Sequence, residues 1–238
     1  MKNIVVYGDV HGCLDEFKIL REKANLKAGD IEVLVGDIIN KGPFSIETLH
    51  YIKKHNILSV MGNNEARIIK LYNRYLKEGE KYLKEIKPHE KETILQITKK
   101  EIVRLEKLPY FLKFSNLTIL HGGIKGSTKL DKKLDNKAKK EITLLRFLDR
   151  NLEPIAWNNF DERYKFWSEL YDGREGFIVF GHHPFNEPKI DEFSLGIDTG
   201  CVYGGKLTAV KFNVNEREEV DTKNYKLISV LALKKYWV

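Results

Sequence analysis

Five short glycine-flanked segments carry the side chains of this sequence that could do chemistry. Each offers a carboxylate, amide or imidazole donor, and its glycines let the backbone turn sharply while keeping the donor accessible. Aspartate, asparagine and histidine together form a mixed oxygen and nitrogen donor set, which suits manganese, iron or zinc better than calcium. The segments are Gly8-Asp9-Val10-His11-Gly12, Gly36-Asp37-Ile38-Ile39-Asn40-Lys41-Gly42-Pro43, Gly62-Asn63-Asn64-Glu65, His121-Gly122-Gly123 and Gly181-His182-His183.

A pair of metal ions would explain why so many donors occur together. Two divalent ions about 3.5–4 Å apart can hold the attacking and leaving oxygens of a phosphoryl displacement. Asp37 stands in the middle of the series and is the natural carboxylate to bridge them. The sequence therefore predicts two divalent metal ions as cofactors, with manganese first and iron or zinc as alternatives.

The elements around the first three segments alternate between strand and helix. Apolar runs at Ile4–Tyr7, Ile31–Val35 and Ile57–Met61 each end at a glycine, which is typical of strands. Helical spacing is found at Leu14–Leu26 and at Ser45–His55, where Ser45 is the expected N-cap. Such an order predicts an α/β sheet with parallel strands, whose carboxyl ends should bring the polar segments to one edge.

The rest of the chain is expected to continue as one domain, residues 1–238, because it has no internal repeat and no linker. Residues 65–108 are predicted to form a helical excursion over the sheet, with Pro88 separating two helices. Further expected elements follow in chain order. They are a hairpin around Ser115-Asn116, a basic loop Lys125–Lys140, helices through Leu144–Leu148 and Phe160–Leu170, a strand Phe177–Phe180, and antiparallel strands within Phe193–Phe212. The side chains of Trp157, Phe160, Phe166 and Trp167 are expected to lie in the core.

Composition narrows the class of protein and its partners. Of 238 residues, 42% are hydrophobic and 32% charged, as in soluble globular proteins, and no run reaches the roughly 18 apolar residues of a membrane span. We expect a cytoplasmic protein with no membrane partner. The net charge of +7 favours anionic partners, but the Lys125–Lys140 loop lacks aromatics for base stacking, so nucleic acid is not expected. Cys13 and Cys201 are expected to be free thiols, and the oligomeric state is left open.

The order of the five segments resembles that of the calcineurin-like metallophosphoesterases. The branch in question holds the serine/threonine phosphoprotein phosphatases and the symmetrical diadenosine-tetraphosphate hydrolases. The stretch Ile197–Ala209 (IDTGCVYGGKLTA) resembles the ending of the tetraphosphate hydrolases specifically. Pro184 stands where nuclease-type relatives carry a second histidine. The resemblance implies a four-layer α/β/β/α sandwich, in which two packed mixed β-sheets are flanked by helices.

The resemblance also implies roles for individual residues, carried over by position. The first ion takes Asp9, His11 and Asp37, and Asp198 completes or supports it. The second ion takes Asp37, Asn63, His121 and His182. The implied catalytic positions are Asp37, Lys41 and Asn64, and the implied substrate contacts are Lys41, Asn64 and Tyr203.

Three positions in the glycine-flanked segments depart from the family pattern. Asn64 replaces the histidine that is thought to protonate the leaving group, and an amide cannot act as an acid near neutrality. Asn40 replaces the aspartate that supports that histidine in the phosphatases. Lys41 replaces an arginine, which keeps the charge but loses the bidentate fork. Since a phosphoanhydride needs leaving-group protonation far less than an alkyl phosphate does, these departures favour anhydride cleavage.

The function predicted from the sequence is therefore metal-dependent phosphoester or phosphoanhydride hydrolysis, on a phosphorylated small molecule or nucleotide. A symmetrical bis(5'-nucleosyl)-tetraphosphatase is the leading interpretation. A serine/threonine phosphatase-like phosphomonoesterase is the first alternative. The second is a metal- or nucleotide-binding protein with weakened catalysis, because both the acid and the arginine are altered.

Overall fold

The structure, a computed structural model, describes residues 2–131, 133–156 and 161–237. Over these residues the chain forms two five-stranded sheets and one three-stranded sheet. The first sheet contains β1 (Lys2–Tyr7), β2 (Ile31–Leu34), β3 (Leu58–Ser59), β12 (Lys206–Val214) and β13 (Val220–Leu231). The second contains β4 (Phe111–Phe114), β5 (Leu117–Leu120), β9 (Phe177–Phe180), β10 (Lys189–Asp191) and β11 (Ser194–Gly196). The third contains β6 (Phe147–Leu148), β7 (Pro154–Ile155) and β8 (Lys165–Phe166).

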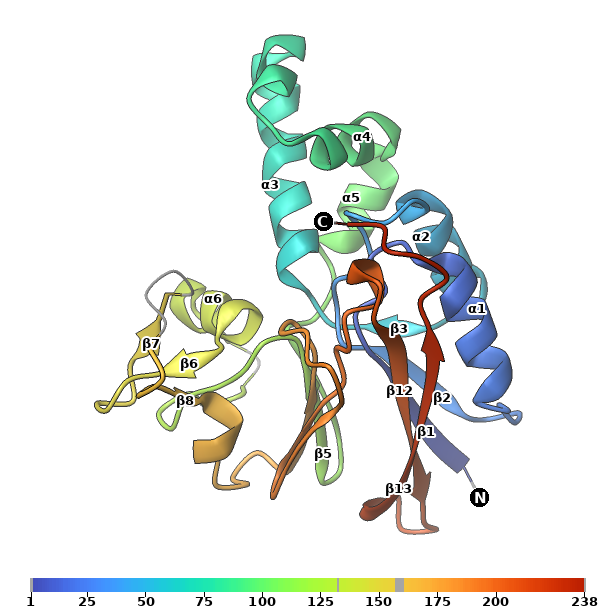
Figure 1. Cartoon of the computed structure of the whole chain (residues 1–238), viewed down its shortest axis with the longest axis vertical. Coiled ribbons are helices and arrows are strands. Elements are labelled where there is room, and N and C mark those ends of the chain that lie inside the picture. Colours follow the sequence, from blue (N-terminus) through green and yellow to red (C-terminus); the bar gives the residue numbers. More distant parts are fainter. Residues whose placement is uncertain (1, 132, 157–160, 238) are drawn as a thin grey trace.

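Helices cover the outer sides of this arrangement (Figure 1). The α-helices are α1 (Leu14–Lys23), α2 (Ser45–Lys54), α3 (Asn63–Glu78), α4 (Pro88–Gln96), α5 (Lys99–Leu105) and α6 (Asn136–Leu144). Short 3-10 helices are η1 (Glu80–Lys84), η3 (Trp167–Leu170) and η4 (Cys201–Tyr203). Within the described ranges, no helix combines the length and the apolar character needed to cross a membrane.

Both large sheets are mixed, and their central strands are parallel. In the first sheet β1, β2 and β3 run parallel, while β12 is antiparallel to β1 and β13 is antiparallel to β12. In the second sheet β5, β9 and β11 run parallel, with β4 and β10 as antiparallel edge strands. The parallel start that the alternating sequence predicted is confirmed, and so is the hairpin of β4 and β5.

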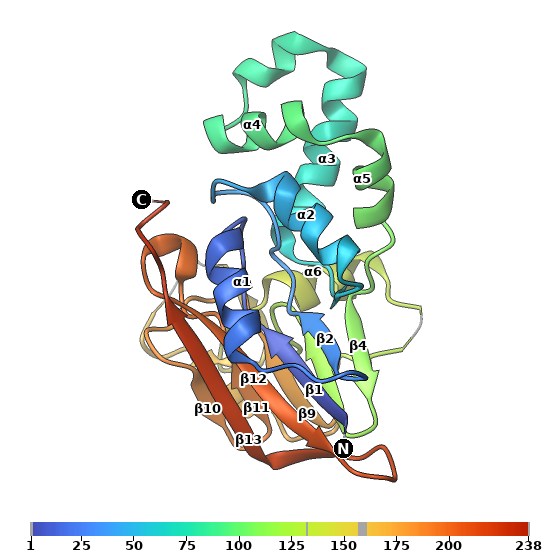
Figure 2. The same cartoon turned by 90° about the vertical axis from the view of Figure 1, so that its right-hand side faces the viewer.

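The period-two alternation of β1 explains how the layers pack. Val6 faces an apolar cluster between the two sheets, together with Ile119 and Val179 of the second sheet. Tyr7 faces the opposite way, and its ring packs edge-on against Phe17 of α1 at 5.0 Å between centroids. Figure 2 shows α1 and α2 along this outer face. A third apolar cluster joins the second sheet to α6 and the small sheet. The expected four-layer sandwich of two sheets flanked by helices is confirmed.

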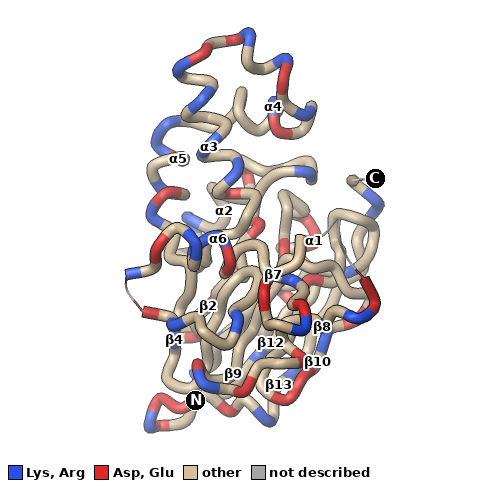
Figure 3. The backbone as a smooth tube through the Cα atoms, turned by 90° about the vertical axis from the view of Figure 1, so that its left-hand side faces the viewer, with Lys and Arg blue, Asp and Glu red and all other residues tan. Residues whose placement is uncertain are grey.

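Residues 65–108 are helical, as the sequence predicted. The helices α3, α4 and α5 extend away from the sheets (Figure 1) and contain both basic and acidic residues along their length (Figure 3). Arg67 of α3 forms an ion pair with the buried Glu90 of α4. Pro88 is the first residue of α4, where a missing N–H group costs nothing.

The secondary structure expected for residues 125–170 was wrong in its details, although Phe166 and Trp167 are buried in the core as expected. The basic segment expected to be a loop contains α6, which begins at Asn136 because the Asp135 carboxylate accepts the Ala138 N–H at 2.7 Å. The two helices expected after it are replaced mainly by β6, β8 and η3. Their apolar residues serve cross-strand packing: the rings of Phe147 and Phe166 meet edge-on at 5.5 Å between centroids. Trp157 and Phe160 lie outside the described residues.

The segment expected to hold adjacent antiparallel strands is instead divided between the two large sheets. Its first strand, β11, pairs parallel with β9 in the second sheet, whereas β12 pairs antiparallel with β1 in the first. Residues 197–205 cross from one sheet to the other, and this crossing carries Asp198 and Tyr203. A smaller correction concerns α2, where Phe44 is the N-cap and the Ser45 hydroxyl accepts the N–H of Asn40 at 2.8 Å.

Candidate metal centre

The predicted metal-binding side chains converge where the parallel strands of the two sheets end. The first sheet supplies them after β1, β2 and β3, and the second sheet supplies them after β5 and β9. Apart from the half-buried Asn63, these donors are almost fully buried. In chain order they are Asp9, His11, Asp37, Asn63, His121 and His182.

Asp37 lies between donors from both sides of the site. Its Oδ1 is 3.3 Å from Nε2 of His121, and its Oδ2 is 3.4 Å from Nε2 of His11. Asn64 holds the same carboxylate from behind, because its backbone N–H donates to Oδ1 at 2.9 Å and its side-chain amide to Oδ2 at 2.6 Å. Each carboxylate oxygen of Asp37 therefore faces a different imidazole.

His11 and His121 are oriented by backbone carbonyl groups. Nδ1 of His11 lies 3.2 Å from the carbonyl oxygen of Ile39, and Nδ1 of His121 lies 2.8 Å from that of Val35. In a neutral imidazole, donation from Nδ1 leaves the lone pair on Nε2, which is the nitrogen that faces Asp37. Burial lowers the pKa of His121 and lowers that of His11 to about 3, so both rings are neutral near pH 7.

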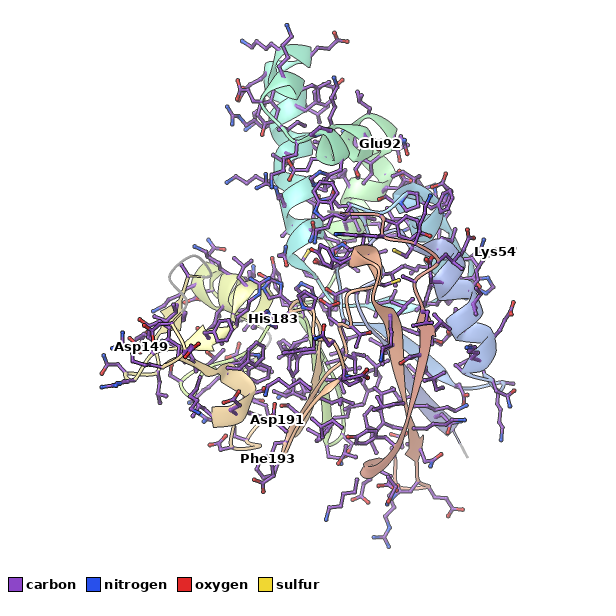
Figure 4. All side chains as sticks on the ribbon, viewed as in Figure 1. Lys54, Glu92, Asp149, His183, Asp191 and Phe193 are labelled. Carbon is purple, nitrogen blue, oxygen red and sulfur yellow. The ribbon has the colours of Figure 1, made fainter. Side chains whose placement is uncertain are left out.

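His182 and Asn63 lie beside His121. The His182 and His121 rings are 5.0 Å apart between centroids, and Nε2 of His182 lies 3.2 Å from the carbonyl oxygen of Leu144. Donation from Nε2 leaves the lone pair of His182 on Nδ1. The side-chain oxygen of Asn63 lies 3.0 Å from Nε2 of His121. Figure 4 shows the neighbouring His183 between the α6 region and the second sheet, where it packs against Phe185.

Two buried carboxylates besides Asp37, those of Asp9 and Asp198, belong to the cluster. Asp9 accepts the N–H of His182 at 3.1 Å, and Asp198 accepts the N–H of Gly200 at 3.0 Å. Burial and the nearby Asp198 and Asp37 carboxylates raise the pKa of Asp9 well above its ordinary value. Burial also raises the pKa of Asp198 to about 6. A bound cation would relieve the cost of burying these like charges together.

The donor set fits a divalent metal ion. Oxygen atoms of Asp9 and Asp37 and a nitrogen of His121 all lie within 4.8 Å of one another. The three histidines point a lone pair away from their backbone partners, which is the usual arrangement of metal-ligating imidazoles. Carboxylates, an amide oxygen and neutral imidazoles are donors that manganese, iron and zinc all accept.

Glu65 fixes the loop that carries Asp37. One carboxylate oxygen accepts the N–H groups of Asp37 and Gly62, and the other accepts those of Ile38 and Ile39, at distances of 2.8–3.2 Å. Asp37 has a φ of 47°, a left-handed conformation that residues other than glycine seldom adopt. The sequence did not predict this role of Glu65, although a glutamate three residues after a strand-end glycine is a helix-capping signal.

Lys41 and Tyr203 meet at the edge of the centre. Nζ of Lys41 lies 3.2 Å from Nε2 of His11 and donates to the Tyr203 hydroxyl at 3.0 Å. Burial alone would lower the pKa of Lys41, but Asp37 and Tyr203 raise it above its ordinary value. The lysine is therefore a fixed positive charge beside the carboxylates, and Tyr203 keeps 37% of its surface exposed.

Asn64 and Asn40 form an amide–amide pair next to Asp37. The side-chain N–H of Asn40 donates to Oδ1 of Asn64 at 2.8 Å. This contact joins two of the three positions at which the sequence departs from the family pattern. Neither side chain can release a proton near neutral pH.

Arg146 is a functional candidate that the sequence did not reveal. Its Nη2 donates to the backbone oxygen of His182 at 3.2 Å. Burial lowers the pKa of Arg146, and the carboxylates of Asp37, Asp198 and Asp9 oppose that effect. It follows α6 directly, in a segment expected to be helical, and no local motif marks it.

Comparison with known proteins agrees with this geometry. The family model described as calcineurin-like phosphoesterase matches residues 2–222. An Oceanobacillus iheyensis protein named bis(5'-nucleosyl)-tetraphosphatase PrpE [asymmetrical] is 31% identical, and the alignment covers 90% of each chain. A Pseudomonas fluorescens protein named bis(5'-nucleosyl)-tetraphosphatase, symmetrical, is 27% identical over 88% of this chain and 91% of its own. A crystal structure provisionally described as a diadenosine tetraphosphatase has a TM-score of 0.75 at 23% identity, covering 97% of this chain and 93% of that chain.

Proposed function

This chain belongs to the calcineurin-like phosphoesterase family, and we propose that it hydrolyses a nucleotide phosphoanhydride, with diadenosine tetraphosphate as the first substrate to test. It is a metal-dependent phosphohydrolase, as its family and its tetraphosphatase-named relatives indicate. The observation that carries the proposal is the site itself: a complete set of metal donors next to an amide where a proton donor would be needed for an alkyl phosphate.

The proposed centre holds two ions, with manganese as the leading candidate. Asp37 would contact both, because each of its oxygens faces a different imidazole. When bound, the ions would polarise the phosphoryl oxygens and neutralise charge that develops in the transition state. We assign Asp9, His11, Asp37 and Asp198 to one ion, and Asp37, Asn63, His121 and His182 to the other.

Two cations of the chain are proposed to hold the substrate phosphates. Lys41 reaches the centre from the first sheet, and Arg146 from the segment after α6. The Tyr203 hydroxyl fixes the lysine, and its exposed ring can contact the substrate. The planar guanidinium of Arg146 can bind a phosphate through two hydrogen bonds, which a lysine in place of the family arginine cannot do.

The absence of a proton donor at position 64 favours an anhydride over an alkyl phosphate as substrate. Proton transfer to a leaving group typically contributes about 10²–10⁴-fold to a rate. An alkoxide that leaves from phosphoserine depends strongly on that proton, whereas a nucleotide phosphate that leaves from an anhydride is already a stable anion. Asn64, which is held between Asp37 and Asn40, is therefore compatible with anhydride cleavage and poorly suited to phosphoserine.

A cavity beside the centre supports a nucleotide substrate. It has a volume of about 430 Å³ and runs between α6 and β7. Arg146 and Leu144 line it, and both contact His182, so the cavity lies next to the residue that bears this proposed ligand. Apolar side chains such as Leu145 and Ile155 provide a surface for a nucleobase, while Lys140 lies at a position suited to phosphate.

The proposal is tested by comparing two substrates under one set of conditions. The chain is stripped of metal, reloaded with manganese and given diadenosine tetraphosphate or a phosphoserine peptide, with Asp37→Asn as the blank. We expect manganese-dependent cleavage of the anhydride and much slower release of phosphate from the peptide. Two ADP molecules would report symmetrical cleavage, and ATP plus AMP would report asymmetrical cleavage. Faster turnover of the peptide would contradict the proposal, and no turnover of either with manganese bound would favour a non-catalytic binding protein.

A further inference from the structure

A second group of side chains that could bind a metal ion lies close in sequence to the loops that carry His11 and Asp198. Cys13, Glu16 and Cys201 are all almost fully buried, and their sulfur and carboxylate oxygen atoms lie within 4.8 Å of one another. The two thiols come from opposite ends of the sequence, Cys13 just before α1 and Cys201 at the start of η4. They are also the only two cysteines of the chain.

Glu16 supplies independent evidence that the group is incomplete. One of its carboxylate oxygens accepts the N–H of Leu233 at 2.9 Å and the hydroxyl of Tyr236 at 2.8 Å. The other oxygen, Oε2, is buried and has no hydrogen-bond partner within the described part of the chain. A buried carboxylate oxygen without a partner is costly, and a cation held between it and the two sulfurs would offset that cost.

The arrangement matches a thiophilic metal in both chemistry and size. Zinc is usually tetrahedral, with zinc–sulfur distances of about 2.3 Å, which places two sulfur ligands about 3.8 Å apart. The 4.8 Å limit on the three ligand atoms leaves room for that geometry after a small side-chain adjustment. Two sulfurs and one oxygen leave a fourth position for solvent. We propose that Cys13, Glu16 and Cys201 bind a zinc ion, separately from the catalytic centre.

The carboxy-terminal residues close over this zinc site. The N–H groups of Tyr236 and Trp237 donate to the carbonyl oxygen of Val202, at 3.0 and 2.9 Å, beside Cys201. Trp237 also packs against His89 of α4 at 4.1 Å between ring centroids. The carboxy terminus is drawn near the base of the helical excursion in Figure 1. The tail therefore lies next to the proposed site and links it to α4.

Zinc at this position would cross-link two catalytic loops. Cys13 lies two residues after His11, and Cys201 lies three residues after Asp198. The ion would hold these loops together from behind, while taking no part in the reaction. Its loss is expected to lower the thermal stability of the chain more than it changes the chemistry.

Cobalt absorption tests the site without relying on catalysis. Cobalt(II) bound to thiolates gives charge-transfer bands in the near ultraviolet, and the donors of the catalytic centre contain no sulfur. We expect these bands when the reduced, metal-free chain is titrated with cobalt(II). They should persist in Asp37→Asn, disappear in Cys13→Ser and Cys201→Ser, and weaken in Glu16→Gln. Absence of the bands in the reduced wild-type chain would overturn the proposal.

A second measurement uses the wild-type chain alone, in case a cysteine variant fails to fold. The rates at which 4,4'-dithiodipyridine modifies the two thiols are compared with and without zinc. Binding should slow both reactions about tenfold when free zinc is about ten times its dissociation constant. Equal rates with and without zinc would contradict a zinc site even if the phosphohydrolase proposal holds.

Discussion

Asn64 is held in a network that leaves it no freedom to act as an acid. Its amide donates to Asp37 and accepts from Asn40, so the position has become part of the support for the Asp37 carboxylate. The same contacts show what a general acid introduced at position 64 would need in order to protonate a leaving group. A histidine at position 64 would require a carboxylate at position 40 in place of the present amide.

The double variant Asn40→Asp, Asn64→His should therefore gain phosphomonoesterase activity. We expect kcat for a phosphoserine peptide to rise by about 10²-fold, the lower end of general acid catalysis, while kcat for diadenosine tetraphosphate changes much less. Asn64→His alone should give a smaller gain, because Asn40 cannot support the imidazolium. Steady-state kinetics on both substrates checks this expectation, and equal gains on the two would refute the role given to Asn64.

His183 should make the stability of the chain sensitive to acid. It packs among the rings of Phe147, Phe166 and Phe185, and burial lowers its pKa to about 4. In the unfolded chain its pKa returns to 6.5, so the unfolded state binds the proton more tightly and stability falls as the pH drops below that value. This one group should cost about 1–2 kcal/mol between pH 7 and pH 5.

Urea unfolding of wild type and His183→Phe at the two pH values measures that contribution. The variant should lose less stability than the wild type on acidification. An equal loss in wild type and His183→Phe would show that His183 is not the group responsible.

At the scale of elements, the site depends on how closely the strand ends approach one another. Gly181, after β9, is where the second sheet meets the first. A Cβ atom there would lie 2.0 Å from Oδ1 of Asp9 and 2.6 Å from a methyl group of Val35. Only glycine lets the backbone of the second sheet come this near to a carboxylate of the first.

Gly181→Ala should therefore weaken metal binding. We expect the displaced Asp9 carboxylate to reduce manganese affinity by about 10–100-fold, as measured by equilibrium dialysis. Gly126→Ala is the matched control, since the nearest atom to its Cβ would be a side-chain nitrogen of Arg174 at 3.5 Å. Unchanged affinity in a folded Gly181→Ala protein would mean that Asp9 is not a ligand.

The cavity between α6 and β7 gives a second prediction for an element. Ala156 lines it, and a tryptophan there should fill the space proposed for a nucleoside. Ala156→Trp should raise KM for diadenosine tetraphosphate about tenfold, or about 1.4 kcal/mol. The turnover of p-nitrophenyl phosphate, which lacks a nucleoside, should stay the same, and Ala156→Ser is the control. Equal effects on both substrates would place the nucleoside elsewhere.

Prediction from the sequence succeeded where short-range signals define the elements. Apolar runs that end at glycine predicted β1, β2 and β9, and the polar residue after each strand end predicted the convergence of donors. It failed where tertiary packing overrides local spacing. The spacing of the apolar residues in β6 and β8 predicted helices, but these residues pair across a small sheet. Arg146 reaches the site only because of that sheet.

The whole molecule brings two halves of one sequence to a common edge. The first sheet supplies donors from residues 9–63 and the second from residues 121 and 182, and the crossing from β11 to β12 adds Asp198 and Tyr203. Sequence order could not show that this crossing joins the two sheets, because strand pairing between distant segments leaves no local signal. The net charge of +7 suits an anionic substrate that approaches this edge.

The number of manganese ions bound per chain tests this arrangement most directly. Equilibrium dialysis of the metal-free chain should give two ions per chain, since the proposed ligands divide into two sets that share Asp37. Asp37→Asn should lose the binding of both ions, and Asn63→Ala should weaken only the second. Two tightly bound ions in Asp37→Asn, or none in the wild type, would contradict a dinuclear centre built on Asp37.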